Sequence, residues 1–192
     1  MGVKKAIGII IILIIIGVIG YYLLEGRLPF LGYSFDNGLA KIDGIDSSYG
    51  LNEERIVPGE EDELKGYLSE LIEFRKELNE LPSSNEVKAL GLLVDARINL
   101  VGMKEALIEA KKETELSHGE GCERGTPTYN AINAFEEAED YASKANSSIK
   151  ELEEDYPMLA EKTREWNENV LVSTTEISER TEELALMLQQ YC

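Results

Sequence analysis

The chain opens with a run of apolar residues that is long enough to cross a membrane. Residues 6–24 carry no charge, and residues 9–16 are all isoleucine or leucine. At about 1.5 Å per residue, a helix over this run is about 28 Å long, close to the thickness of the hydrocarbon core. A helix that is apolar on every side has no face for water. We therefore predict a transmembrane signal-anchor helix at residues 6–24.

The charges beside this run predict its direction. Lys4 and Lys5 precede it, whereas Glu25 and Arg27 follow it. Positive flanks stay in the cytoplasm. We therefore expect residues 1–5 to be a cytoplasmic tail and the rest of the chain to be translocated, so that the protein is a single-pass protein of the cell membrane.

Two alternatives to an uncleaved anchor remain open. A cleaved signal peptide has a shorter apolar region followed by small residues, whereas this run ends at Tyr21 and Tyr22, which are typical of the membrane interface. A type IV pilin-like subunit also begins with a basic segment and an apolar helix. The glutamate that such subunits carry near the start of that helix is absent from residues 7–12.

Residues 25–59 have a different pattern, because glycine and proline interrupt any helical period. We predict an irregular, glycine-rich linker or membrane-proximal collar here. Asp43 and Asp46 lack the spacing of a calcium-binding EF-hand loop, so we expect a turn at these two residues. The interrupting residues are Gly26, Pro29, Gly32, Gly38, Gly44, Gly50, Pro58 and Gly59.

Beyond Pro58 the apolar positions recur every three or four residues, which predicts amphipathic helices. The first covers residues 60–81 and ends at Pro82. Ser83 and Glu86 match a capping box, so the second runs from there to about residue 118. Thr126 and Pro127 mark the start of a third helix over residues 127–155, with an alanine-rich buried side. The Tyr156–Pro157 break begins a fourth over residues 157–191.

The fourth helix carries apolar residues at heptad spacing. One column contains residues 163, 170, 177, 184 and 191, and a second contains residues 159, 166, 173, 180 and 187. We predict a heptad-like seam with polar breaks at Ser173 and Arg180, in which Trp166 anchors the core, and a ligand-stacking role for Trp166 remains open. Short connections make successive helices antiparallel. The expected fold is therefore all-α, with the transmembrane helix followed by an antiparallel up-down-up-down four-helix bundle over residues 60–192.

The two cysteines and one sequon fit a location outside the cytoplasm. In the expected bundle Cys122 and Cys192 lie at the same end, so we predict a disulfide between them, although a bridge from Cys192 to another chain remains open. We expect that end to face the membrane linker. Asn146 begins the tripeptide Asn-Ser-Ser and is a glycosylation candidate.

The charge balance restricts the partners. The chain has 37 acidic and 19 basic residues and a formal net charge of −18. Such a surface repels nucleic acid and anionic lipid, so we expect no nucleic-acid partner. The charge fits a highly solvated surface, and the alternative is a basic or cationic partner. We expect a protein partner or self-association, and contact with the membrane through the N-terminal helix.

No pattern in the sequence predicts catalysis or a cofactor. His118 is the only histidine, and Glu115 with His118 makes a single Glu-x-x-His motif where a di-iron bundle needs two. His118, Glu120 and Cys122 could form a surface metal site, but a histidine at a helix end beside a disulfide loop is the simpler explanation. We therefore predict no metal, no cofactor and no enzyme activity. Phosphate-loop, dinucleotide and nucleophile-elbow motifs are absent from the sequence.

These observations lead to a structural or protein-interaction role in the cell envelope. A ligand-binding or sensor module is the alternative, and it needs a partner membrane subunit because only about five residues are cytoplasmic. A pilin-like assembly subunit is a third hypothesis.

Overall fold

The computed structural model describes residues 33–52, 55–117 and 123–190, and within these residues all regular structure is helical, without strands. This confirms the predicted all-α class. The chain divides into two units, Met1–Ser34 and Phe35–Cys192. The second unit contains α2 (Phe35–Ser48), α3 (Glu61–Glu80), α4 (Asn85–Leu116), α5 (Pro127–Asp155), α6 (Pro157–Ala160), the 3₁₀ turn η1 (Glu161–Thr163) and α7 (Arg164–Gln190).

The predicted membrane anchor lies outside the described part of the chain. Both the tail at residues 1–5 and the apolar run at residues 6–24 precede the first described residue. None of the helices that the structure describes is long and apolar enough to span a bilayer.

The prediction of an irregular segment over residues 25–59 is wrong for residues 35–48, which form α2, whereas residues 33–34, 49–52 and 55–59 are irregular as expected. Phe35, Ile42 and Ile45 repeat at helical spacing and are buried. Gly38, which we expected to break a helix, lies against Leu90 of α4. Asp43 and Asp46, which were expected in a turn, therefore lie on a helix.

The start of α4 differs from the predicted cap by one residue, whereas the start of α5 is as predicted. The Ser84 hydroxyl, not that of Ser83, accepts the Val87 amide at 3.2 Å. The Thr126 hydroxyl accepts the Tyr129 amide at 3.3 Å, and Pro127 occupies the first turn.

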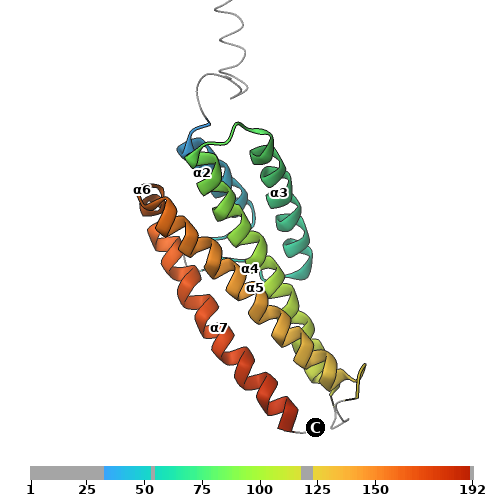
Figure 1. The fold of residues 1–192 in the computed structure, drawn as a ribbon. Coiled ribbons are helices and arrows are strands. Elements are labelled where there is room, and N and C mark those ends of the chain that lie inside the picture. Colours follow the sequence, from blue (N-terminus) through green and yellow to red (C-terminus); the bar gives the residue numbers. More distant parts are fainter. Residues whose placement is uncertain (1–32, 53–54, 118–122, 191–192) are drawn as a thin grey trace, which may run out of the picture. The chain divides into compact units, whose positions relative to one another are not determined.

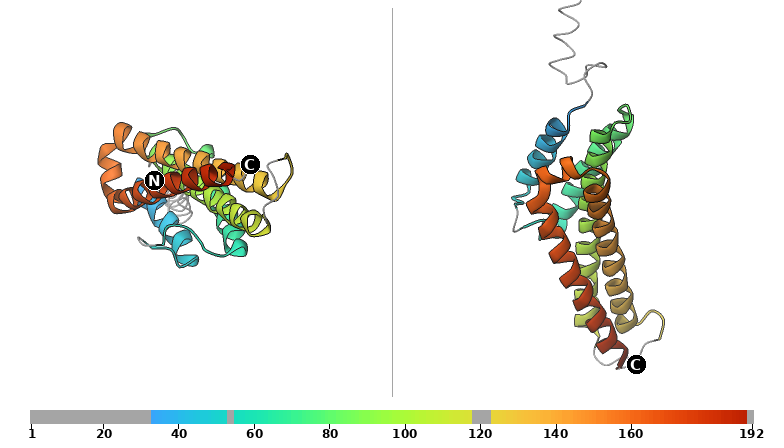
Figure 2. Two further views of the ribbon diagram at one scale, coloured as in Figure 1. Left: turned by 90° about the horizontal axis from the view of Figure 1, so that it is seen from below. Right: turned by 60° about the vertical axis from the view of Figure 1, so that its left-hand side comes forward.

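The central element is α4, whose two halves have different neighbours (Figure 1; Figure 2). Its first half packs against α2 and α3: Gly38 of α2 faces Leu90, and Arg75 of α3 pairs with Asp95. The side chain of Tyr141 on α5 packs over Gly102 of α4. The last part of α4 packs with α5 and α7, and the cluster there comprises Leu107, Ala110, Ala134, Phe135, Leu184, Ala185 and Leu188.

The contacts also give the directions of the helices. Glu113 of α4 bonds Asn130 of α5, near the connection between them, so α4 and α5 are antiparallel. Gly38 lies opposite Leu90 and Asp46 opposite Arg97, so α2 runs parallel to α4. An additional helix therefore precedes the four that the sequence predicted.

The face that α7 buries is only half as predicted. In the first column Thr163 and Val170 are buried and Ile177 and Leu184 are half-buried, as expected. The second column is less buried than expected: Met187 is exposed, Trp166 is only half-buried, and Arg180, which was expected as a polar break, is exposed. Its place is taken by Asn167, Thr174 and Thr181, which are polar, buried and seven residues apart. Of these three, Thr174 donates to Asn146 of α5, and the nearby Ser178 donates to Glu139 of α5.

The ends of the helices bear on the predicted disulfide. The α4–α5 connection and the C-terminal end of α7 lie at the same end of this unit (Figure 1). Cys122 and Cys192 themselves lie outside the described residues, so their bond stays a prediction.

We expected the helical unit to begin at this end, and that expectation is wrong. The chain joins the helical unit at Phe35, where Asp36 pairs with Lys162 beside the α5–α7 turn. This is the opposite end of the unit, and the cause is the extra helix α2, which adds one reversal of direction.

The close approach at Gly38 predicts opposite effects for two glycines of α2. A Cβ at Gly38 would lie 2.2 Å from Cδ1 of the buried Leu90, so Gly38→Ala should lower the free energy of unfolding by about 1–3 kcal/mol. At Gly44 nothing lies within 4 Å of an added Cβ. Gly44→Ala should therefore raise the free energy of unfolding by about 0.5–1 kcal/mol through helix propensity. Thermal unfolding of the full-length variants, followed by far-UV circular dichroism, measures both; equal effects would contradict the packing.

Candidate functional site

A buried arginine lies where α2, α3, α4 and α7 meet. Arg97 of α4 is only 3% exposed, which is rare for a charged side chain unless it is paired. Its partner is Asp46 of α2: Nη2 donates to Oδ2 at 2.8 Å and Nε donates to the same oxygen at 3.1 Å. Nη1 donates to the Leu93 carbonyl at 3.3 Å. The pair therefore fixes α2 on α4 with strong, charge-assisted bonds.

Tyr67 adds α3 to this network. Its hydroxyl donates to Oδ1 of Asp46 at 2.6 Å, and its ring is buried. Burial, followed by the negative charge of Asp46, raises the pKa of Tyr67 above its ordinary value, so the phenol stays protonated and remains a donor. The ring of Tyr49 meets it edge-on, with 5.3 Å between centroids.

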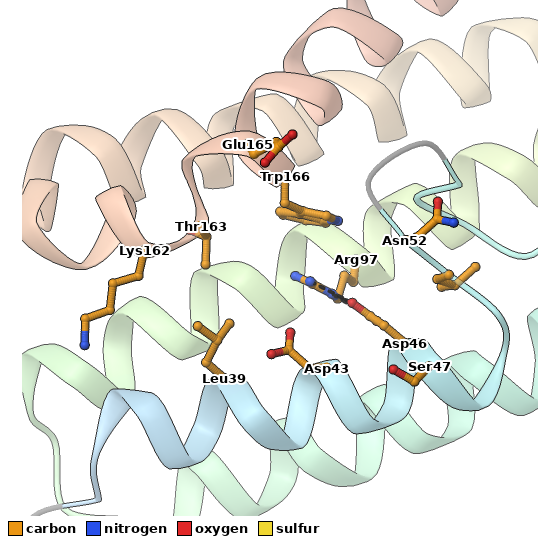
Figure 3. A pocket seen from close by; sticks show the side chains of 11 residues that line it. Leu39, Asp43, Asp46, Ser47, Asn52, Arg97, Lys162, Thr163, Glu165 and Trp166 are labelled. Carbon is orange, nitrogen blue, oxygen red and sulfur yellow. Dashed lines mark hydrogen bonds and ion pairs between the residues drawn. The ribbon is translucent and has the colours of Figure 1, made fainter.

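Trp166 adds α7. Its indole ring lies over the Arg97 guanidinium, with Cζ 3.8 Å from the ring centroid (Figure 3). This is a cation–π contact, and it is stronger where water is excluded. One guanidinium thus holds Asp46 at its edge and Trp166 on its face. We call Asp46, Tyr67, Arg97 and Trp166 the Arg97 network.

A pocket of about 360 Å³ opens beside this network, between α2, α4 and the η1–α7 segment (Figure 3). Its size falls in the range of small-molecule sites. Its lining combines apolar side chains with charged and polar ones: Leu39, Asp43, Asp46, Ser47, Leu51, Asn52, Arg97, Lys162, Thr163, Glu165 and Trp166.

The charges of the pocket are unevenly neutralised. Arg97 is balanced by Asp46, and Lys162 pairs with Asp36, its Nζ 2.5 Å from Oδ1. Asp43 lies one helical turn from Asp46 on α2. Burial, offset in part by Arg97 and increased by Asp46, raises the pKa of Asp43 above its ordinary value. The Asp43 side chain is exposed on α2, so its carboxylate is accessible from the pocket.

The sequence-predicted site residues lie elsewhere. Asn146 is half-buried on α5, and its amide oxygen accepts the Thr174 hydroxyl, which gives it a packing role between α5 and α7. Its use as a glycosylation acceptor stays a prediction. The candidate metal ligands His118, Glu120 and Cys122 lie outside the described residues. The predicted role of Trp166 as a core anchor of the heptad seam is wrong, because the side chain is only half-buried and covers Arg97. The alternative, a ligand-stacking role, stays a prediction.

Sequence reasoning missed Asp46, Tyr67 and Arg97 as a group. One signal was present: Arg97 interrupts the buried face formed by Leu90, Val94 and Val101, at spacings of three and four. A charged residue at such a position needs a partner. Asp46 could not be identified as that partner while its segment was taken to be irregular.

The described residues contain no group of three or more histidine, cysteine, aspartate or glutamate side chains arranged to hold a metal ion. The pocket offers groups that suit ligand binding, namely carboxylates, hydroxyls and a wall of aromatic and aliphatic side chains. Comparison of the chain with models of protein families, with curated proteins and with solved structures finds no match.

The burial of the Arg97–Asp46 pair predicts a large effect on stability. Arg97→Met leaves Asp46 without its counter-charge, and Asp46→Asn leaves the guanidinium unbalanced, so each should cost about 3–5 kcal/mol of unfolding free energy. The double variant should cost clearly less than the sum, because neither charge is then left alone.

A matched control is the Arg75–Asp95 pair, which also has two bonds, from Nε to Oδ1 at 2.8 Å and from Nη2 to Oδ2 at 3.1 Å, but side chains 32% and 36% exposed. Arg75→Met should cost about 1 kcal/mol or less. Denaturant unfolding of the full-length variants measures all four values. Equal losses for Arg75→Met and Arg97→Met would contradict the role given to burial.

Proposed function

We propose that this chain is a membrane-anchored helical protein whose bundle lies outside the cytoplasm and presents an acidic surface to a protein partner in the cell envelope. The proposed anchor is the apolar helix at residues 6–24, with residues 1–5 in the cytoplasm. The proposed bundle is the antiparallel series α3, α4, α5 and α7, to which α2 is added. We propose no catalytic role.

The observation that carries this proposal is the charge of the α5–α7 surface. These two helices pack on each other through alanines, threonines and the apolar cluster that contains Phe135, and their outward faces are strongly acidic. Exposed acids there far outnumber exposed bases, which are Lys144, Lys150, Arg164 and Arg180. The acids are Glu136, Glu137, Asp140, Glu151, Glu153, Glu154, Asp155, Glu165, Glu168, Glu176, Glu179, Glu182 and Glu183. Such a field favours a basic partner and speeds its association.

The location rests on the sequence. The two lysines before the apolar run support a cytoplasmic N-terminus. A disulfide between Cys122 and Cys192, which we also propose, would form in the oxidising compartment outside. The shared end of α4, α5 and α7 supports this pairing.

A ligand-binding module is the second candidate, and the pocket beside the Arg97 network favours it. Polar groups converge there from α2, α4 and α7 beside an aromatic wall. Such a module would pass its signal through a partner membrane subunit.

Cross-linking in intact cells tests the proposed partner surface. A photo-reactive amino acid replaces Val172, which is 57% exposed and lies among the acids of α7. We expect a covalent adduct with a basic protein domain outside the cytoplasm. The triple change Glu176→Gln, Glu179→Gln and Glu183→Gln should reduce the yield about tenfold or more, because rim charges set the rate of association.

The matched control places the same reactive group at Ile72, an exposed apolar residue of α3. This position should give little or no adduct. The proposal is contradicted by equal adducts from both positions, by a yield that ignores the three glutamines, or by the absence of any adduct from Val172.

A further inference from the structure

We propose that the pocket between α2, α4 and the η1–α7 segment binds a small primary amine, with its ammonium group on Asp43 and its alkyl chain against Leu39, Leu51 and Trp166. This inference rests on the second candidate function, the ligand-binding module, and names the chemical class of the ligand.

The charge of the pocket selects a cation over an anion. Both basic residues of the lining already have counter-charges, Arg97 in Asp46 and Lys162 in Asp36. The remaining charged residues of the lining are the acids Asp43 and Glu165. An anionic ligand would be repelled by these two carboxylates, and both basic side chains of the lining are already paired. The formal net charge of −18 adds to this repulsion.

The geometry of α2 gives the ammonium group its acceptors. Asp43 and Ser47 are four residues apart and therefore lie on the same face of the helix. Both line the pocket, and the Asp43 side chain extends from α2 toward the Arg97 guanidinium (Figure 3). A primary ammonium group has three donors. The Asp43 carboxylate and the Ser47 hydroxyl can accept two of them.

The rest of the lining suits a short hydrocarbon chain. Leu39 and Leu51 supply aliphatic surface, and Trp166 supplies an aromatic ring that the Arg97 network holds in place. The volume of about 360 Å³ is near the lower limit for ligand pockets, which fits a small molecule. Binding would cost little reorganisation, because both walls are already fixed.

Asp43 is an exposed residue of α2 whose carboxylate loses part of its hydration at the pocket wall. Because burial raises the pKa of Asp43, the folded state holds its proton more tightly than the unfolded state does. Stability from this group is therefore present at low pH and falls as the pH rises through the folded pKa. At neutral pH Asp43→Asn should leave the fold intact or slightly more stable, whereas an ammonium ligand would satisfy the charge.

The test uses the full-length protein in detergent micelles and follows tryptophan fluorescence. Trp166 is the only tryptophan in the chain, so the signal reports directly on the pocket. The probes are n-butylamine and butane-1,4-diamine, compared at equal ionic strength with succinate, magnesium chloride and calcium chloride. We expect a saturable change in Trp166 fluorescence with the amines alone. Asp43→Asn should weaken it about tenfold or more, the loss expected for a charged hydrogen bond. Asp155→Asn, the same change at an exposed helix end, should have no effect.

Each other outcome overturns the inference. A response to succinate, or to a metal ion without the amines, would show that the ligand class is wrong while the pocket still binds a ligand. An amine response that Asp43→Asn leaves unchanged would show that the ammonium group binds elsewhere. The absence of a response to every probe would remove both this inference and the ligand-binding module on which it rests.

Discussion

The arrangement of the helices depends on one buried positive charge. Arg97 is nearly inaccessible to water, so the fold must supply a counter-charge, and Asp46 of α2 supplies it with two short bonds. Asp46 is in turn held by Tyr67 of α3, and the guanidinium face is covered by Trp166 of α7. Desolvation makes this pair costly unless every partner is in place. Its partners come from α2, α3 and α7, so the pair joins these three helices to α4.

The sequence predicted local features well and long-range pairing poorly. The all-α class, α3 and the α5 boundaries follow from apolar spacing, proline and capping residues, all of which act within a few positions. The helix α2 was missed because Gly38 and Gly44 lower helix propensity. The contact with Leu90 that requires a glycine at position 38 comes from another helix, so local spacing cannot reveal it. The α7 face was displaced by one residue because Asn167, Thr174 and Thr181 are buried and polar. Hydrophobic periodicity cannot identify such positions.

The same causes kept the site from view. Asp46 and Arg97 are 51 residues apart in the chain, and Trp166 comes from a third segment. Spacing rules relate residues within one helix, so they could indicate that Arg97 needs a partner but not which one. The pocket follows from the network: the packing that encloses Arg97 also places Asp43 and Trp166 on facing walls. The acidic outer surface, by contrast, could be predicted from composition alone.

The most direct measurement is amide hydrogen exchange on the full-length protein and its Arg97→Met variant, resolved by helix. If the Arg97 network fixes the other helices on α4, exchange should become faster in α2 and at the start of α7, while the α4–α5 pair beyond Gly102 keeps its protection. Unchanged exchange in α2, or a uniform loss of protection along α5, would contradict the role given to the buried pair.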